Sequence, residues 1–205
     1  FTDEQIGWRI LGTALGYGLG FMAVAKVHQI IGKRLAIVWS AVGLSIAWSA
    51  AVTLRLFDLA PENTTWALLI FVVFFGTIQS TFGAILNVSV MSALADIVDE
   101  HELNTGRRQE GIFYSARTFF AKLTTSMGLV IAGIALDLIE FPRGKEAGEI
   151  DPEKIYALGL IDGPFAMIWG LIAAAIYAGY KLDERKHSQI RAQLEERNSR
   201  LLQSS

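Results

Sequence analysis

The chain is organised as long apolar blocks separated by short polar stretches. Leu35–Leu54 and Trp66–Leu94 contain no charged residue, and Leu158–Tyr180 contains a single acid near its start. A helix needs about 20 apolar residues to cross the roughly 30 Å hydrocarbon core of a bilayer. These runs are far longer than the about ten alternating residues of a membrane β-strand. The pattern therefore predicts an all-α membrane protein.

About five membrane-spanning helices fit this pattern, followed by a charged tail over residues 183–205. The tail alternates acids and bases around a thin apolar stripe, which favours a solvated helix over one that lies on the membrane surface or docks on the loops. Because Phe1 is followed almost at once by a span, we expect the chain to be part of a larger protein. The predicted spans are residues 6–25, 35–54, 66–94, 112–138 and 155–180.

The connecting segments fall into two groups according to their number of lysine and arginine residues. The larger group follows the first span, precedes the fourth and follows the fifth. Cytoplasmic segments carry an excess of these residues, so this group is predicted to be cytoplasmic. The C-terminus would then be cytoplasmic and the start of the chain outside, in a bacterial-type inner membrane.

The composition argues against several kinds of chemical site. The chain of 205 residues is 52% hydrophobic, with a mean hydropathy of +0.39. It contains no cysteine, and its three histidines are scattered, which argues against disulfides, a thiolate nucleophile and a metal site. We expect no metal, no cofactor and no nucleic-acid partner.

Three glycines lie on one face of the first span, at Gly12, Gly16 and Gly20. Small residues at this spacing let two helix backbones approach closely. The pattern predicts tight packing against another span, and a surface that slides during transport is the alternative.

A dense charged segment, predicted to be a loop, begins at Asp96 and runs into the fourth span. Opposite charges here can form a network that holds one conformation closed and breaks when domains move. A plain solvated loop is the alternative. The residues of this predicted cytoplasmic charge network are Asp96, Asp99, Glu102, Arg107, Arg108 and Glu110.

The fourth span carries two cations, Arg117 and Lys122. Lys122 lies about 15 Å along the axis from the start of the span. At that depth snorkelling is marginal, and a charge inside a span is a functional-site hypothesis by default. We therefore expect Lys122 to face a transport pathway or an acid, with Thr118 on the same face and Tyr114 and Arg117 close beside it. For Arg117, a gate or membrane anchor is an equal alternative.

The charged segment resembles one family in particular. The strings Ala95-Asp96-Ile97-Val98-Asp99 and Thr105–Gly111, then Tyr114-Ser115 and Lys122, are similar in order and spacing to the glycoside–pentoside–hexuronide:cation symporter family of the major facilitator superfamily. The resemblance implies spans eight to twelve of twelve, that is, part of the C-terminal half of the bundle. It also implies symport of a sugar or related solute with Na⁺ or H⁺. The implied partners are the solute, the lipid bilayer and the missing N-terminal half.

The resemblance also implies roles for single residues. Asp96, Asp99, Glu102 and Arg108 match the family's charge network between the halves. Lys122 matches a lysine near the cation and sugar sites, and Thr118 matches a position that faces the sugar.

Two positions depart from melibiose permease, the best-known member of that family. Asn87 stands where the permease has a sugar-contacting Trp, and Arg117 stands where it has a Gln. Because arginine binds carboxylates bidentately, these changes favour an anionic solute such as a uronate.

Three other functions stay open from the residues alone: a transporter of a lipid-type solute, a polytopic membrane enzyme, and a non-transporting sensor. An enzyme would need acids or histidines placed for metal or acid–base chemistry near an interface. Asp96 and Asp99 lack such partners in the sequence, so we expect a transporter and not an enzyme.

Overall fold

The computed structural model describes residues 3–63, 65–142, 144, 149–179 and 184–203, and this part is helical without a β-strand. Four helical segments are long and apolar enough to cross a membrane, which confirms the all-α membrane fold. Arg143, Lys145 and Lys181, which belong to the connecting segments that were compared above for their lysine and arginine content, lie outside the described residues. The elements are α1 (Asp3–Leu56), α2 (Trp66–Thr105), α3 (Glu110–Leu138), α4 (Pro152–Leu160), a π-helical turn η2 (Ile161–Phe165), α5 (Ala166–Ala178) and α6 (Glu184–Gln203).

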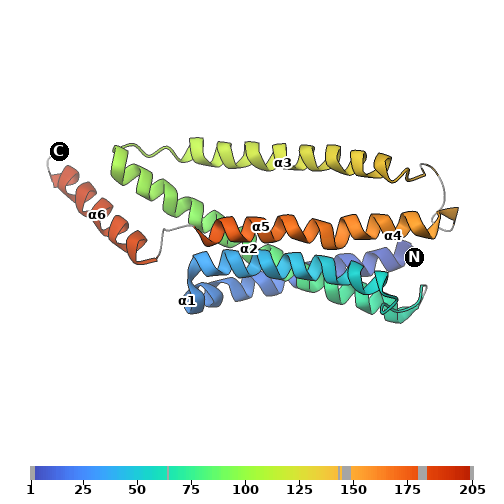
Figure 1. Cartoon of the computed structure of the whole chain (residues 1–205). Coiled ribbons are helices and arrows are strands. Elements are labelled where there is room, and N and C mark those ends of the chain that lie inside the picture. Colours follow the sequence, from blue (N-terminus) through green and yellow to red (C-terminus); the bar gives the residue numbers. More distant parts are fainter. Residues whose placement is uncertain (1–2, 64, 143, 145–148, 180–183, 204–205) are drawn as a thin grey trace.

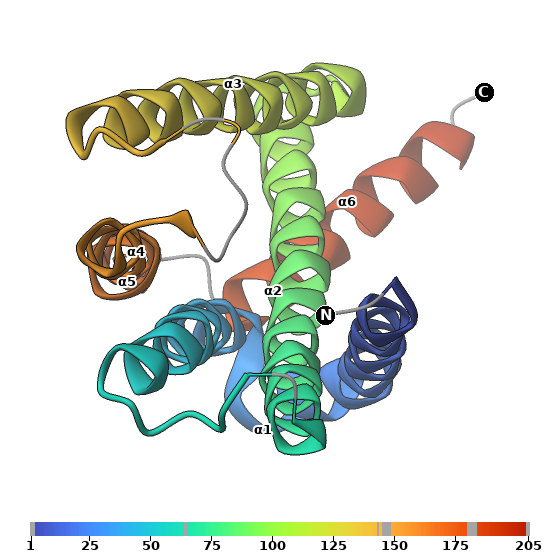
Figure 2. The ribbon, with the colours of Figure 1, turned by 90° about the vertical axis from the view of Figure 1, so that its right-hand side faces the viewer.

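Helix α1 consists of two arms joined at Gly32. This glycine has φ 75° and ψ 162°, a backbone conformation that interrupts the helix and that residues with a Cβ rarely adopt. The chain reverses there, so α1 accounts for the first two predicted spans. The two arms flank α2 on opposite sides (Figure 1, Figure 2).

Helix α2 continues well past the predicted end of its apolar span. We expected a loop from Asp96, and that expectation is wrong, because the helix runs through the acidic residues to Thr105. It ends at Gly106, whose left-handed backbone (φ 72°) lets its N–H donate to the carbonyl of Glu102 at 2.9 Å. Asp96, Asp99 and Glu102 are therefore held on a rigid helix.

Small residues bring the helices of the bundle together. A Cβ placed on Gly16 would lie 2.3 Å from the backbone oxygen of Thr77, and one on Gly20 would lie 2.6 Å from the Cβ of Ala84. Gly12 similarly meets Val73. The structure thus places Gly12, Gly16 and Gly20 against α2, where packing between close backbones replaces the hydrophobic effect available in water.

The last predicted span is interrupted at its acid. Between α4 and α5, Pro164 and Asp162 lie in the π-helical turn η2, and the three segments together pack along the second arm of α1. Gly163 lies against Val52 in this contact.

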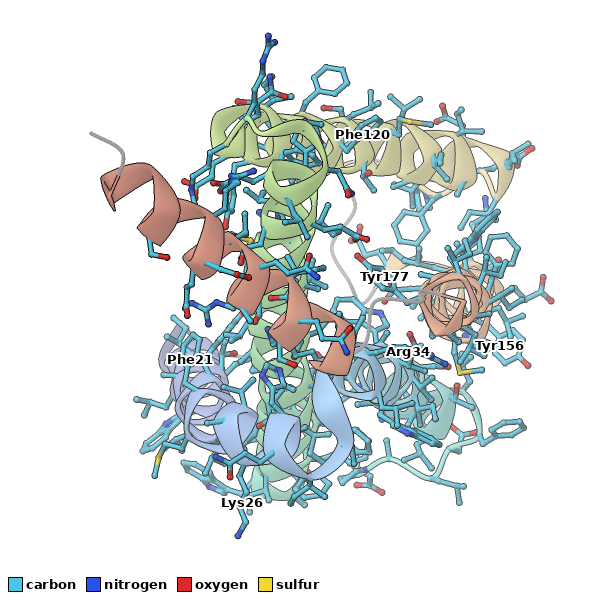
Figure 3. All side chains as sticks on the ribbon, turned by 90° about the vertical axis from the view of Figure 1, so that its left-hand side faces the viewer. Phe21, Lys26, Arg34, Phe120, Tyr156 and Tyr177 are labelled. Atoms are coloured by element: carbon cyan, nitrogen blue, oxygen red, sulfur yellow. The ribbon has the colours of Figure 1, made fainter. Side chains whose placement is uncertain are left out.

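Helices α3 and α6 are placed differently from the bundle. Helix α3 stands off from α1 and α5 (Figure 1, Figure 2) and has no buried residue. Helix α6 crosses α2 near its C-terminal end (Figure 3). In Figure 3, which faces this end, Lys26 and Arg34 mark the region of the α1 turn.

Candidate functional site

The charged end of the bundle begins with an ion pair between α1 and α2. The Nζ of Lys33 lies 2.8 Å from both carboxylate oxygens of Asp96, whose side chain is 11% exposed. The break at Gly32 brings Lys33 to this position, one residue into the second arm. In the sequence, Lys33 is only one of the basic residues that follow the first predicted span. Asp96 follows a long apolar run in the sequence, and this position could have indicated that its carboxylate needs a basic partner.

A second polar contact lies about two helical turns from Asp96 along α2, between α2 and the first arm of α1. The Nε2 of His28 lies 2.7 Å from the Oγ of Ser89, which is fully buried and donates to the carbonyl of Ile85. Further along α2, Thr77 donates to the carbonyl of Gly12 and Gln79 to that of Ala47. These polar groups of α2 thus make contacts between helices, while Asn87 on the same helix is exposed.

At the same charged end of the bundle, Arg108 pairs with three acidic side chains. Its Nη1 lies 3.0 Å from Glu102 and 3.7 Å from Asp99, and its Nε donates to Glu110 at 2.8 Å. The hydrogen bonds to Glu110 and then to Glu102 raise the pKa of Arg108 above its ordinary value, against a smaller opposing effect of burial. Because Asp99 and Glu102 lie on α2, Arg108 in the connection and Glu110 on α3, this cluster ties α3 to α2.

Arg107 occupies a different place from the rest of the predicted network. Its side chain is exposed and makes no ion pair within the part of the chain that the structure describes. Its backbone N–H donates to the Oγ1 of Thr105 at 3.3 Å.

Helix α6 adds a cation that the sequence did not point to. The guanidinium of Arg197 lies 3.2 Å from the carboxylate of Glu102 and 3.3 Å from its carbonyl oxygen. Ile190 and Leu194 are buried, and Leu103 of α2 packs against them. The expectation of a wholly solvated tail is therefore wrong for this stripe. The spacing of four residues between Ile190 and Leu194 was the feature of the sequence that could have indicated this docking.

The predicted pathway residues of α3 line an open face. Thr118 and Lys122 are exposed, whereas Tyr114 and Arg117 are half-buried. Thr118 donates to the carbonyl of Tyr114 at 2.9 Å. Among the described residues, neither Arg117 nor Lys122 forms an ion pair, and no group of three His, Cys, Asp or Glu side chains is placed to hold a metal.

Comparisons with known proteins identify the kind of molecule to which this arrangement belongs. Residues 2–184 match the family model described as MFS/sugar transport protein. A protein of Synechocystis sp. named an uncharacterized symporter is 34% identical over 113 residues, which is 52% of this chain and 20% of that relative. Another of that name from Bacillus subtilis is 23% identical over 180 residues, or 85% of this chain and 35% of the relative. The chain thus spans about a fifth and about a third of these relatives. No solved structure shows a significant match.

Proposed function

This chain belongs to the MFS/sugar transport protein family, and on that basis we propose that the intact protein is a cation-coupled symporter of an organic solute. In this proposal two helical halves rock about a site near the middle of the membrane. The chain supplies spans of the C-terminal half, and the rest of the protein supplies the other half. The observation that supports it most strongly is a cation on an open face of an apolar span, at Lys122.

The position of Lys122 carries this argument. An ammonium facing hydrocarbon is expensive, and Lys122 lies too far along α3 to reach the polar headgroups easily. The described residues give it no counter-ion. Water or an acid from the remainder of the protein would supply what this chain lacks, and both are found at the interface between the halves of a transporter.

We propose an anionic solute, such as a uronate, as the substrate class. Arg117 is half-buried beside the face that carries Lys122, and its guanidinium is matched in shape to a carboxylate. Asn87 offers an amide in place of an aromatic surface for a neutral sugar ring. The coupling ion is proposed to be Na⁺ or H⁺.

The charge network is proposed to act as a cytoplasmic latch. Arg108 and Glu102 join α2, α3 and α6 at one end of the bundle, which is the end with the larger group of basic segments. The proposal therefore includes a cytoplasmic C-terminus and a bacterial inner membrane. Separation of these ion pairs when the halves rock would make the cluster a two-state element.

Uptake into vesicles tests the proposal directly. The intact protein, reconstituted and given an inward Na⁺ or H⁺ gradient, is expected to accumulate a radiolabelled uronate above the level without a gradient. No gradient-driven accumulation of acidic or neutral sugars would contradict it. Uptake of a lipid-type solute would reassign the substrate.

The substrate class has its own test. Arg117→Gln is expected to lower uronate uptake at least tenfold and to affect a neutral sugar less, because only the uronate carboxylate loses its partner. Unchanged uptake of the uronate by this variant would remove Arg117 from the binding site.

A further inference from the structure

A cavity of about 430 Å³ lies at the end of the bundle opposite the charge network. It is lined by the last turns of α1, the first turns of α2, and α4 with η2, and it is open to the surface. Its walls are mostly apolar, with Val52, Leu56 and Phe71 among them. Two charged side chains also line it, Arg55 and Asp162.

Neither of these charges is neutralised by the part of the chain that the structure describes. The guanidinium of Arg55 donates to two neutral acceptors, the carbonyl of Pro61 at 3.0 Å and the Oδ1 of Asn63 at 2.9 Å. The carboxylate of Asp162 makes no hydrogen bond or ion pair with the described residues. Asp162 lies within the last apolar span, where a charge is expensive and points to a function.

The backbone conformation around Asp162 places this residue at the cavity. The N–H of Ala166 donates to Ile161 and Gly163, and so bypasses the carbonyl of Asp162, its ordinary α-helical partner. The indole N–H of Trp48 donates to that carbonyl at 3.1 Å. Such π-helical turns are frequent at functional sites. The turn is therefore fixed to α1 through the main chain, and the carboxylate stays available to a ligand.

We propose that this cavity binds a phospholipid with a zwitterionic, primary-ammonium headgroup, of the phosphoethanolamine type. One guanidinium and one carboxylate complement one phosphate and one ammonium. Arginine binds phosphate through parallel hydrogen bonds, and an ammonium donates to a carboxylate. An acyl chain fits along the apolar wall, and the bilayer around the spans supplies such molecules.

Native mass spectrometry of the intact protein, taken from bilayers that contain ethanolamine, choline and glycerol phospholipids in equal amounts, tests this site. The wild-type protein is expected to retain the ethanolamine lipid about tenfold over the choline lipid, since choline has no N–H to donate. Asp162→Asn is expected to abolish that preference. Arg55→Gln, which keeps donors for the adjoining loop, is expected to lower retention of all three lipids.

A matched control is Asp58→Asn. Asp58 is an exposed acid three residues after Arg55, with φ 57°, a conformation that asparagine tolerates, and it does not line the cavity. This variant should retain lipids as the wild type does.

Three results would overturn the proposal. The first is equal retention of the three headgroups by the wild-type protein. The second is displacement of the lipid by glycerophosphoethanolamine, which lacks acyl chains and would indicate a site for a soluble zwitterion. The third is a lower melting temperature for Asp162→Asn with the headgroup preference intact, which would indicate an ion pair with the remainder of the protein.

Discussion

Helices α2 and α3 have similar apolar composition but very different surroundings. Both are long and apolar enough to cross a membrane, yet α2 lies between the two arms of α1 while α3 has no buried residue. The polar groups of α2, such as Thr77 and Ser89, bond to neighbouring helices. The polar groups of α3, above all Lys122, lie on an open face of the helix. The comparison indicates that α2 is the scaffold of the described bundle and that α3 stands at its open edge.

The largest effect on stability is expected where α1 meets α2. Gly16→Leu would force a side chain into the backbone of Thr77, and overpacking of this kind lowers the free energy of unfolding by about 3 kcal/mol. Thermal unfolding of the intact protein in detergent measures it. Gly18→Leu is the control, because a Cβ at Gly18 meets nothing within 4 Å. Equal melting temperatures for the two variants would contradict the packed interface.

A smaller effect is expected at the ion pair between Lys33 and Asp96. Asp96→Asn leaves the partly buried ammonium of Lys33 without its carboxylate, and we expect a loss of about 2 kcal/mol. The control is Glu140→Gln, which removes the partner of Lys154 in an exposed pair and should change stability by about 0.5 kcal/mol or less. If the melting temperature falls no further for Asp96→Asn than for the control, the pair does not stabilise the bundle.

A local effect is expected at α6. Arg197→Ala removes one of two cations from Glu102, while Arg108 stays, so global stability should fall by less than about 1 kcal/mol. Hydrogen exchange in α6 should nevertheless become faster, because the helix loses its polar contact with α2. Arg191→Ala, an exposed position, is the control. Unchanged exchange in α6 would show that its apolar stripe alone docks it.

Hydropathy was sufficient to predict an all-α membrane fold with long apolar helices. The apolar runs around Trp66–Leu94 and residues 112–138 correspond to α2 and α3, and the spacing of Gly12, Gly16 and Gly20 indicated close packing. These features depend on residue types that are near in sequence, and so they are visible in a single chain.

The features that sequence reasoning missed depend on contacts distant along the chain. Asp96 belongs to a helix because α2 continues beyond its apolar run, and polar side chains do not by themselves end a helix. Its partner, Lys33, is brought to it by the turn at Gly32. The π-helical turn at Asp162 and the docking of Arg197 likewise need knowledge of the neighbouring helix.

Of the substitutions considered, one at Lys122 is expected to have the smallest effect on stability and the largest effect on transport. Because its side chain is exposed and unpaired among the described residues, Lys122→Ala should leave the melting temperature within the range of an ordinary surface substitution, about 0.5 kcal/mol. Lys154→Ala, on α4 outside the proposed pathway, is the control for loss of a lysine.

The most direct test of the account is gradient-driven uptake by these two lysine variants in reconstituted vesicles. The account predicts that Lys122→Ala loses coupled uptake at least tenfold while its melting temperature is unchanged, and that Lys154→Ala transports as the wild type does. Full coupled uptake by Lys122→Ala would contradict the assignment of the open face of α3 to the transport pathway.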